Sequence, residues 1–197
     1  MIDIKKAMYD RIKSIISTWN EESIYAISFF VYSNESYEYN EFNNISTFAI
    51  SYNTEDDCDH SDQYSEKRWN YAFWRQDEFP IIDPYVSDSL IDELFRWYKE
   101  NGIQNIGYED NESCYDNEMR YIGKGPIGHY ELINLVSEVA KELQEDGFIK
   151  DHFQKKLPII IHGLEYVWYD IEATKKANPH GEADVFLAAL KKIGMIQ

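Results

Sequence analysis

The chain has 197 residues, of which 44% are hydrophobic and 28% are charged, as in an ordinary globular protein, so disordered, collagen-like and coiled-coil classes are excluded. Its net charge of −17 opposes binding to nucleic-acid phosphates and anionic lipid and favours a basic partner. The mean hydropathy is −0.56, and no apolar run approaches the roughly 20 residues of a membrane-spanning helix. The length fits a single domain over residues 1–197.

The first third of the chain predicts one helix followed by two strands. Apolar residues from Ile4 to Trp19 recur at helical spacing and predict an amphipathic helix over residues 2–19. Two segments rich in β-branched and aromatic residues predict strands over residues 24–33 and 46–54. The polar stretch between them predicts a turn or a wide hairpin.

The middle of the chain predicts an acidic loop over residues 55–66 and then a third strand. Trp69, Tyr71 and Phe73 alternate with other residues, and a period of two is typical of a strand. We expect these three rings to face the core, with Trp74 on the opposite face. An exposed Trp is a residue type that anchors interfaces.

The remainder predicts mainly helices. Helical periodicity is found in four segments, over residues 85–101, 127–146, 170–177 and 182–193. Residues 103–125 are the least regular stretch, and the apolar run 158–162 predicts a short buried strand. Strands early and helices late predict an α+β fold. We expect a mostly antiparallel sheet of about four strands, with the N-terminal helix and several C-terminal helices packed on it.

The negative charge is concentrated in residues 55–118, which carry eighteen acids and five bases. The run Asp56–Asp62 superficially looks like a metal loop but lacks the glycine and the closing glutamate of an EF-hand. We interpret it as a solvated acidic loop that attracts a basic partner, and we expect no metal at Cys58 and His60. The expected contact residues are acids with two aromatic anchors: Asp56, Asp57, Asp59, Asp62, Glu66, Tyr64 and Trp74.

The segment Gly123–Gly128 matches the GxGxxG pattern of dinucleotide-binding turns and precedes a predicted helix. No convincing strand leads into it, and Pro126 removes one amide donor. We therefore expect no dinucleotide cofactor. An alternative role is a weak anion site formed by Arg120, Lys124 and Gly125 at the start of the helix.

No catalytic constellation is recognisable. The two cysteines form no CxxC pair, the five histidines show no metal-ligand spacing, and no GxSxG turn is present. A Ser–His–Asp arrangement stays open because triads assemble in space. Glu165, Asp170 and Glu172 could pair as carboxylates, but such spacing is common. The residues favour a binding protein over an enzyme, with no cofactor and no metal.

Four segments carry a resemblance that spans most of the chain: Phe48–Tyr52, Arg68–Trp74, Ile160–Tyr166 and Thr174–Pro179. Together they resemble an uncharacterised bacterial family of small, acidic, cytosolic proteins, several of which lie near polymorphic-toxin loci. The resemblance implies an immunity-type function and transfers no catalytic motif. The SUKH-type immunity proteins are similar in size and acidity, although this chain lacks their Leu-Pro…Asn-Gly-Gly pattern.

The leading hypothesis is a cytoplasmic immunity protein that neutralises a basic toxin domain, such as a nuclease. The segment Met1–Lys6 lacks the apolar run of a signal peptide, which agrees with a cytoplasmic location. We expect a monomer or a weak homodimer that binds neither nucleic acid nor membrane. One alternative is an enzyme or anion-binding regulator that uses Arg120, Lys124 and the Gly123–Gly128 turn. Another is a protein whose acidity serves only solubility.

Overall fold

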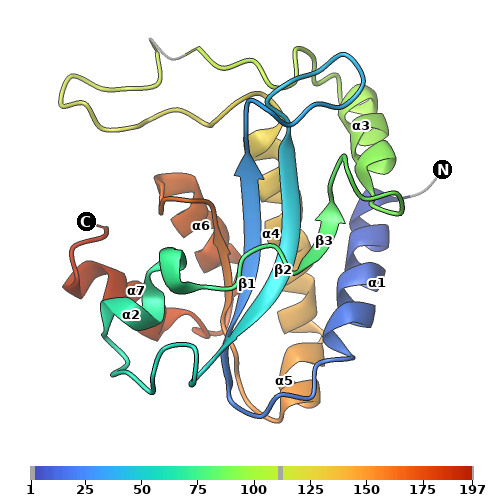
Figure 1. The fold of residues 1–197 in the computed structure, drawn as a ribbon. Coiled ribbons are helices and arrows are strands. Elements are labelled where there is room, and N and C mark those ends of the chain that lie inside the picture. Colours follow the sequence, from blue (N-terminus) through green and yellow to red (C-terminus); the bar gives the residue numbers. More distant parts are fainter. Residues whose placement is uncertain (1–2, 111–112, 197) are drawn as a thin grey trace.

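The computed structural model describes residues 3–110 and 113–196. Within them a four-stranded sheet, in the order β3-β2-β1-β4, lies between helices (Figure 1). The strands are β1 (Ile24–Ser33), β2 (Ser46–Thr54), β3 (Phe79–Ile82) and β4 (Ile159–His162). The helices are α1 (Ile4–Ile16), α2 (Glu66–Trp69), α3 (Ile91–Glu100), α4 (His129–Glu145), α5 (Phe148–Phe153), α6 (Trp168–Ala177) and α7 (Asp184–Lys192), with a 3-10 turn η1 (Tyr71–Phe73). The expected α+β fold with a mostly antiparallel sheet is confirmed.

The central strand β1 is buried on both faces, which explains its nearly continuous apolar sequence. Ile27, Phe29 and Val31 belong to the larger core, to which α1, α3 and α4 contribute. Tyr25 and Ala26 belong to a smaller core with side chains from α2 and α7. The sheet therefore has helices on both sides, and both its faces exclude water.

β1 pairs antiparallel with β2 and parallel with β4. Because parallel strands end at the same edge of a sheet, the chain leaves β1 after Ser33 and β4 after His162 at neighbouring points. The first residue of α4, His129, and Gly163, the residue that follows β4, line the same hollow. This edge of the sheet brings together backbone from three distant parts of the sequence.

The outer edge of β4 is covered by the side chains of Thr174 in α6 and of Asn178, the residue that follows α6. The Thr174 hydroxyl accepts a hydrogen bond from the Ile161 amide at 2.9 Å and donates one to the Ile161 carbonyl at 3.0 Å. The Asn178 side chain accepts from the Ile159 amide at 2.9 Å and donates to the Ile159 carbonyl at 2.7 Å. These bonds satisfy backbone groups that an edge strand otherwise leaves unpaired.

The strand predicted over residues 69–74 is wrong, because this segment forms α2 and η1. The Ser65 hydroxyl accepts from the Lys67 amide, and the Asn70 side chain accepts from the Ala72 amide, so each short turn begins with a polar cap. The predicted faces also change: Phe73 is 53% exposed, whereas Trp74 is only 7% exposed. The third strand is instead β3, an edge strand that tolerates Pro80 because its other side needs no ladder bond.

The other predicted elements are present with shifted ends. The helix predicted from residue 85 begins at Ile91, because residues 83–90 turn first, with the Asp83 carboxylate accepting from the Tyr85 amide at 2.7 Å. Gly147, at φ +80°, ends α4, and α5 follows it as a short helix that the sequence analysis missed. Residues 103–110 and 113–125 form no helix or strand of the sheet, as expected for this stretch.

Residues 108–110 and 113–124, here called the outer loop, extend from the body of the protein, and the chain returns to it at the start of α4 (upper left of Figure 1). At its base the Gly107 amide donates to the Ile127 carbonyl and the Ile127 amide donates to the Tyr108 carbonyl, each at 2.9 Å. The indole of Trp168 donates to the Gly123 carbonyl at 2.9 Å. These bonds fix the position of the outer loop relative to the start of α6.

Candidate binding cleft

The acidic loop 55–66 is largely held by internal contacts. The Asp57 carboxylate accepts hydrogen bonds from the amide and hydroxyl of Thr54, at 2.7 and 2.8 Å, and pairs with Arg75 at 3.0 Å. Burial alone would raise the pKa of Asp57, but the Thr54 and Arg75 bonds outweigh it and hold the pKa below its usual range. Glu55 pairs with Arg68. Asp57 therefore anchors the loop and is only partly available to a partner.

Four other expected contact acids lie on the surface: Asp56, Asp59, Asp62 and Glu66. Asp56 pairs with His60 at 2.9 Å, and Asp59 pairs with Lys67, whose hydrogen bond lowers the pKa of Asp59. Tyr64 is half-buried, with the Lys192 ammonium 4.4 Å from its ring centre. Several charges of this loop are thus offset by neighbouring cations.

Trp74 lies in the smaller core and not on a surface. Its ring centre is 5.1 Å from that of His162 and 6.5 Å from that of Phe186, and its indole donates to the Arg68 carbonyl at 2.8 Å. The expectation that Trp74 is an exposed anchor is corrected by this burial. Its aromatic character serves packing in the free protein.

The three residues of the expected anion site each have a different partner. Arg120 pairs with Asp116 and Glu118, and the Lys124 ammonium lies 4.8 Å from the ring centre of Tyr130. The Gly125 amide donates to the Tyr121 hydroxyl at 2.7 Å. The two cations and the Gly125 amide that would bind an anion therefore already contact other groups of the protein.

Internal packing accounts for the glycines of the Gly123–Gly128 turn. Gly125 and Gly128 have positive φ angles of +71° and +97°. A Cβ on Gly125 would lie 2.7 Å from the His129 ring, and one on Gly123 would lie 2.7 Å from the Cys114 sulfur. The turn therefore needs glycine for reasons that involve no ligand.

Two buried serine–histidine pairs occupy the sheet edge region. Ser28 and His162 Nε2 are 2.7 Å apart, and His162 Nδ1 lies 2.9 Å from the Gly163 carbonyl. Because a carbonyl only accepts, Nδ1 carries the proton and Nε2 accepts from Ser28. The second pair joins Ser46 to His129 Nδ1 at 2.8 Å. Ser28 and His162 are fully buried, and neither belongs to the lining of the cleft described next.

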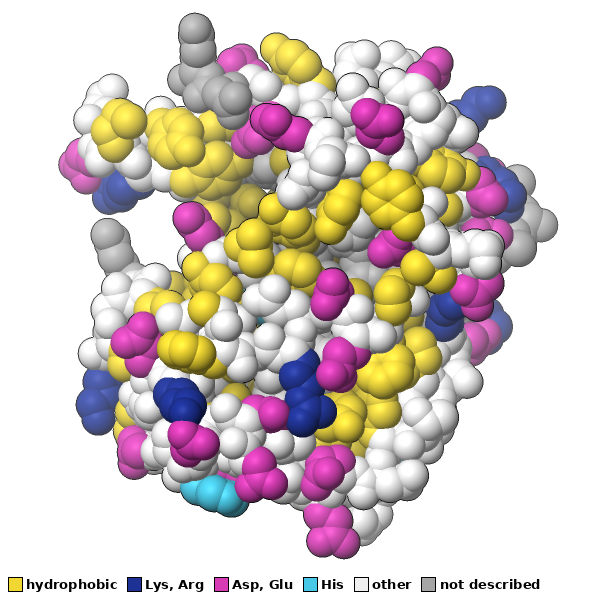
Figure 2. Space-filling model, viewed as in Figure 1, with side chains coloured by type: hydrophobic (Ala, Val, Ile, Leu, Met, Phe, Trp, Pro, Cys, Tyr) yellow, Lys and Arg dark blue, Asp and Glu magenta, His cyan; other side chains and the backbone are white. Residues whose placement is uncertain are grey.

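A cleft opens between the outer loop and the start of α6. It consists of two adjoining hollows of about 420 and 240 Å³, which share Ser33, Glu165, Val167 and Tyr169. The space-filling view shows a hollow below the outer loop, with hydrophobic and tyrosine side chains gathered on the loop above it (Figure 2). The cleft has the size of a small-ligand pocket and lies at the carboxyl ends of the two parallel strands.

Carboxyl groups and tyrosine rings line this cleft, and none of its described lining residues is Lys or Arg. The carboxyl groups belong to Glu109, Glu165 and Asp170, and the rings to Tyr32, Tyr115, Tyr121 and Tyr169. The Tyr121 hydroxyl donates to Glu109 at 2.8 Å. Burial has the larger effect and this bond the next, and both raise the pKa of Tyr121, so its hydroxyl stays neutral.

Asp170 is 1% exposed and belongs to the lining of the smaller hollow. Its Oδ2 accepts from the Val167 amide at 3.3 Å and caps α6, whereas its Oδ1 has no hydrogen-bond partner among the described residues. Burial raises the pKa of Asp170 well above its usual range, against the opposing effect of the Val167 and Gly163 amides. A buried carboxyl with one unmatched oxygen is costly, which marks this position as a candidate binding group.

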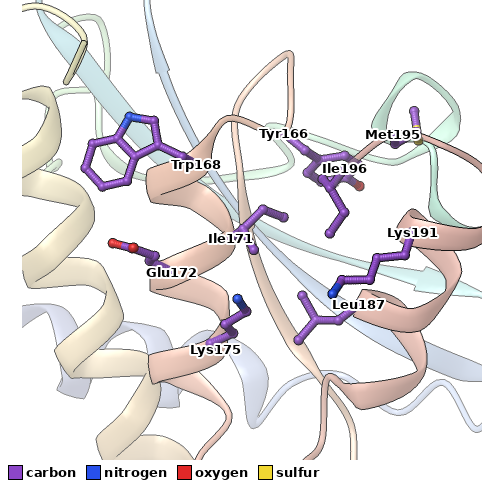
Figure 3. A pocket seen from close by; sticks show the side chains of 9 residues that line it. All are labelled: Tyr166, Trp168, Ile171, Glu172, Lys175, Leu187, Lys191, Met195 and Ile196. Carbon is purple, nitrogen blue, oxygen red and sulfur yellow. The ribbon is translucent and has the colours of Figure 1, made fainter. Parts of the chain in front are cut away.

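Sequence reasoning missed the cleft because its acids come from separate segments without a motif. The spacing of Glu165 and Asp170 is too common to indicate a site, and Glu109 lies in the irregular stretch. The third acid of that group, Glu172, lies instead in a groove between α6 and α7, where Ile171 and Lys175 face Leu187 and Lys191 (Figure 3). The tyrosine-rich outer loop was the available signal.

Comparisons with protein-family models, with curated proteins and with solved structures found no match to this chain. Among the described residues, no helix combines the length and apolar character needed to cross a membrane. Within the same residues, no three His, Cys, Asp or Glu side chains are grouped so that they could hold a metal ion.

Proposed function

We propose that this chain is a binding protein that recognises a basic protein partner. The observation that carries the proposal is the cleft, whose walls present carboxyl groups and tyrosines without Lys or Arg among the described lining residues. Residues 76–118, which include one side of the cleft, contain twelve acids and two bases. Such a surface raises the association rate with a positive partner, and its aromatic rings supply contact area.

The partner class that we propose is a toxin domain, with this chain as its cytoplasmic immunity protein. The support is the resemblance of Arg68–Trp74 and Ile160–Tyr166 to a family with members near polymorphic-toxin loci. Nucleases carry basic surfaces that contact nucleic-acid phosphates. A carboxylate-rich inhibitor would compete with phosphate for that surface, which makes a basic nuclease domain the expected target.

The test is to co-express this chain with the basic domains encoded beside its gene and to measure growth and association. We expect rescue of growth and an association rate that falls at least about tenfold between 50 and 500 mM NaCl, because salt screens charge steering. Glu165→Gln should slow association. Glu182→Gln, which lies between α6 and α7 and outside the lining of the cleft, should not. If this chain neither rescues growth nor associates at low salt with any of these domains, the proposal is contradicted.

A further inference from the structure

The smaller hollow of the cleft contains a buried acceptor that the fold leaves unmatched. Asp170 Oδ1 makes no hydrogen bond of normal length and angle with a described residue, although Asp170 is almost fully buried, lines the hollow and lies near enough to the Gly163 amide for that amide to oppose the rise of its pKa. Its neighbours in the lining include Glu165 at the surface and Gly163 after β4. A hydrogen-bond donor with a positive charge would match both the unpaired oxygen and the two carboxyl groups.

The spacing of the carboxyl groups points to an organic cation and not to a metal ion. Glu109 lies on the outer-loop side of the cleft, and Glu165 and Asp170 lie on the α6 side. They are not grouped closely enough to hold a metal ion. A ligand that reaches both sides must therefore be extended, with several donors.

The tyrosine rings narrow the choice among organic cations. Tyr32 and Tyr169 line the smaller hollow with Asp170, and Tyr169 also lines the larger one. In the larger hollow the ring centre of Tyr121 is 6.5 Å from that of Tyr169 and 5.4 Å from that of Tyr115, both with edge-to-face geometry. A planar guanidinium stacks on such rings, offers five donors in a fixed fork, and is more weakly hydrated than an ammonium. It is the cation best suited to a partly buried site lined by tyrosine and carboxylate.

The starts of α4 and α6 border the same hollow, and a helix start by itself favours an anion. In this protein each start already has an acid of its own first turn. Glu131 accepts from the Gly128 amide at 3.1 Å, and Asp170 accepts from the Val167 amide. The partial positive charge at each helix start is therefore offset by an acid of the same helix, and the cleft keeps its preference for a cation.

We infer that this cleft binds an arginine side chain of the basic protein partner, with Asp170 and Glu165 accepting hydrogen bonds from its guanidinium and the tyrosines enclosing it. The inference rests on the proposed function, since it assigns the group by which that partner is recognised. Asp170 is then a binding residue whose unmatched oxygen in the free protein is completed by the partner.

The probe for this test is N-acetyl-arginine N-methylamide, titrated into the full chain while amide NMR signals are followed. The matched probes are the citrulline analogue, which has the same shape without the charge, and the lysine analogue. We expect saturable changes in the amide chemical shifts of Gly163 and Tyr169 with the arginine probe only. Binding of the citrulline or lysine probe as tight as that of the arginine probe would overturn the inference, as would no saturable shift.

Variants in α6 and in the segment just before it locate the site. Asp170→Asn keeps an acceptor for the Val167 amide but removes the charge, and Glu165→Gln removes the charge at the rim; each should weaken the arginine probe about tenfold. Glu172→Gln, on the same helix but outside the cleft, should leave the affinity unchanged. Unchanged affinity in both cleft variants would overturn the assignment. If the probe fails while salt-dependent association with a basic domain persists, only the arginine site is refuted and the proposed function stands.

Discussion

At the scale of single residues, Asp170 combines a structural role with a stability cost. Its Oδ2 caps α6, which an asparagine oxygen can also do, but its charged form is disfavoured by burial. A carboxyl whose folded pKa is raised stabilises the fold fully only below its unfolded pKa near 4, and this contribution is lost as the pH rises through the folded pKa. At neutral pH the wild-type protein therefore carries a penalty at this position.

Replacing Asp170 with Asn should stabilise the free protein at pH 7 by about 1–3 kcal/mol, because the cap remains and the buried charge is removed. The gain should shrink towards pH 4, where Asp170 is neutral in the folded state. Urea unfolding at both pH values measures the difference. A loss of stability at pH 7 would show that the carboxylate is matched within the fold, which would also remove the reason for a ligand there.

His129 and His162 predict a pH dependence of the opposite sign. Burial lowers the pKa of each to about 4, and for His162 the Gly163 carbonyl opposes this only in part. A histidine with a depressed folded pKa stabilises the fold fully above its unfolded pKa near 6.5 and loses this contribution as the pH falls towards 4. Each should contribute a slope of up to about 1.4 kcal/mol per pH unit in that window.

This slope is best measured by urea unfolding between pH 7 and 4.5 in the Asp170→Asn variant, where the opposing effect of Asp170 is absent. His129→Asn should reduce the slope, because Asn can still bond to Ser46 but does not titrate. His60→Gln is the control, since His60 is exposed on the acidic loop. If the free energy of unfolding does not change with pH in this window, or if His129→Asn and His60→Gln give the same slope, His129 is not a neutral buried histidine.

At the scale of elements, the sequence patterns located β1 and β2 at their observed bounds because long apolar runs between polar turns have few alternatives. The segment 69–74 was misjudged because local alternation and tertiary packing conflict there. Trp69 and Trp74 both enter the smaller core around Phe186, and their spacing fits a turn and not a strand. Only the position of α7, which comes much later in the chain, decides which rings are buried.

This packing predicts that Trp74→Ala costs about 3–5 kcal/mol of unfolding free energy, because a large cavity forms beside Trp69 and His162. Phe73→Ala, at the adjacent exposed position, should change stability by less than about 0.5 kcal/mol. Chemical denaturation of both variants provides the comparison. Equal effects at the two positions would contradict the buried placement of Trp74.

The cleft could not be read from the sequence for a related reason. Glu109, Glu165 and Asp170 come to line the two adjoining hollows of the cleft only when β4 pairs with β1 and the Gly123 carbonyl of the outer loop accepts a hydrogen bond from Trp168. The burial of Asp170 depends on this docking, and its unmatched oxygen is invisible in a pattern of residue types. The acidic loop 55–66 is more conspicuous in the sequence than the acids of the cleft. Its charges are nevertheless better neutralised, because Lys67, Arg68 and Arg75 pair with them.

At the scale of the whole molecule, the net charge of −17 implies repulsion among the surface acids. Asp77, Glu78 and Glu100 lie exposed in the most acidic stretch of the chain. This repulsion opposes the compact state and is screened by salt, since the Debye length falls from about 30 Å at 0.01 M to about 3 Å at 1 M.

The thermal midpoint should therefore rise by several degrees between 10 mM and 500 mM NaCl. A variant with Asp77→Asn, Glu78→Gln and Glu100→Gln should have a higher midpoint at low salt and a weaker salt dependence. Sucrose at matched osmolality controls for effects of solute exclusion. A midpoint that falls with added NaCl would show that ion pairs outweigh repulsion in this protein.

The covering of β4 by Thr174 and Asn178 has a consequence for the order of events on the ribosome. β1 and β2 emerge early and can pair at once, but the other edge of β1 waits for β4. During that interval β1 offers an open, apolar edge to other chains, which is a hazard for aggregation. When residues 159–178 emerge, one docking step pairs that edge, seals β4 behind it and brings Asp170 into the cleft. A nascent chain thus loses its aggregation-prone edge at the same moment as the walls of its cleft come together.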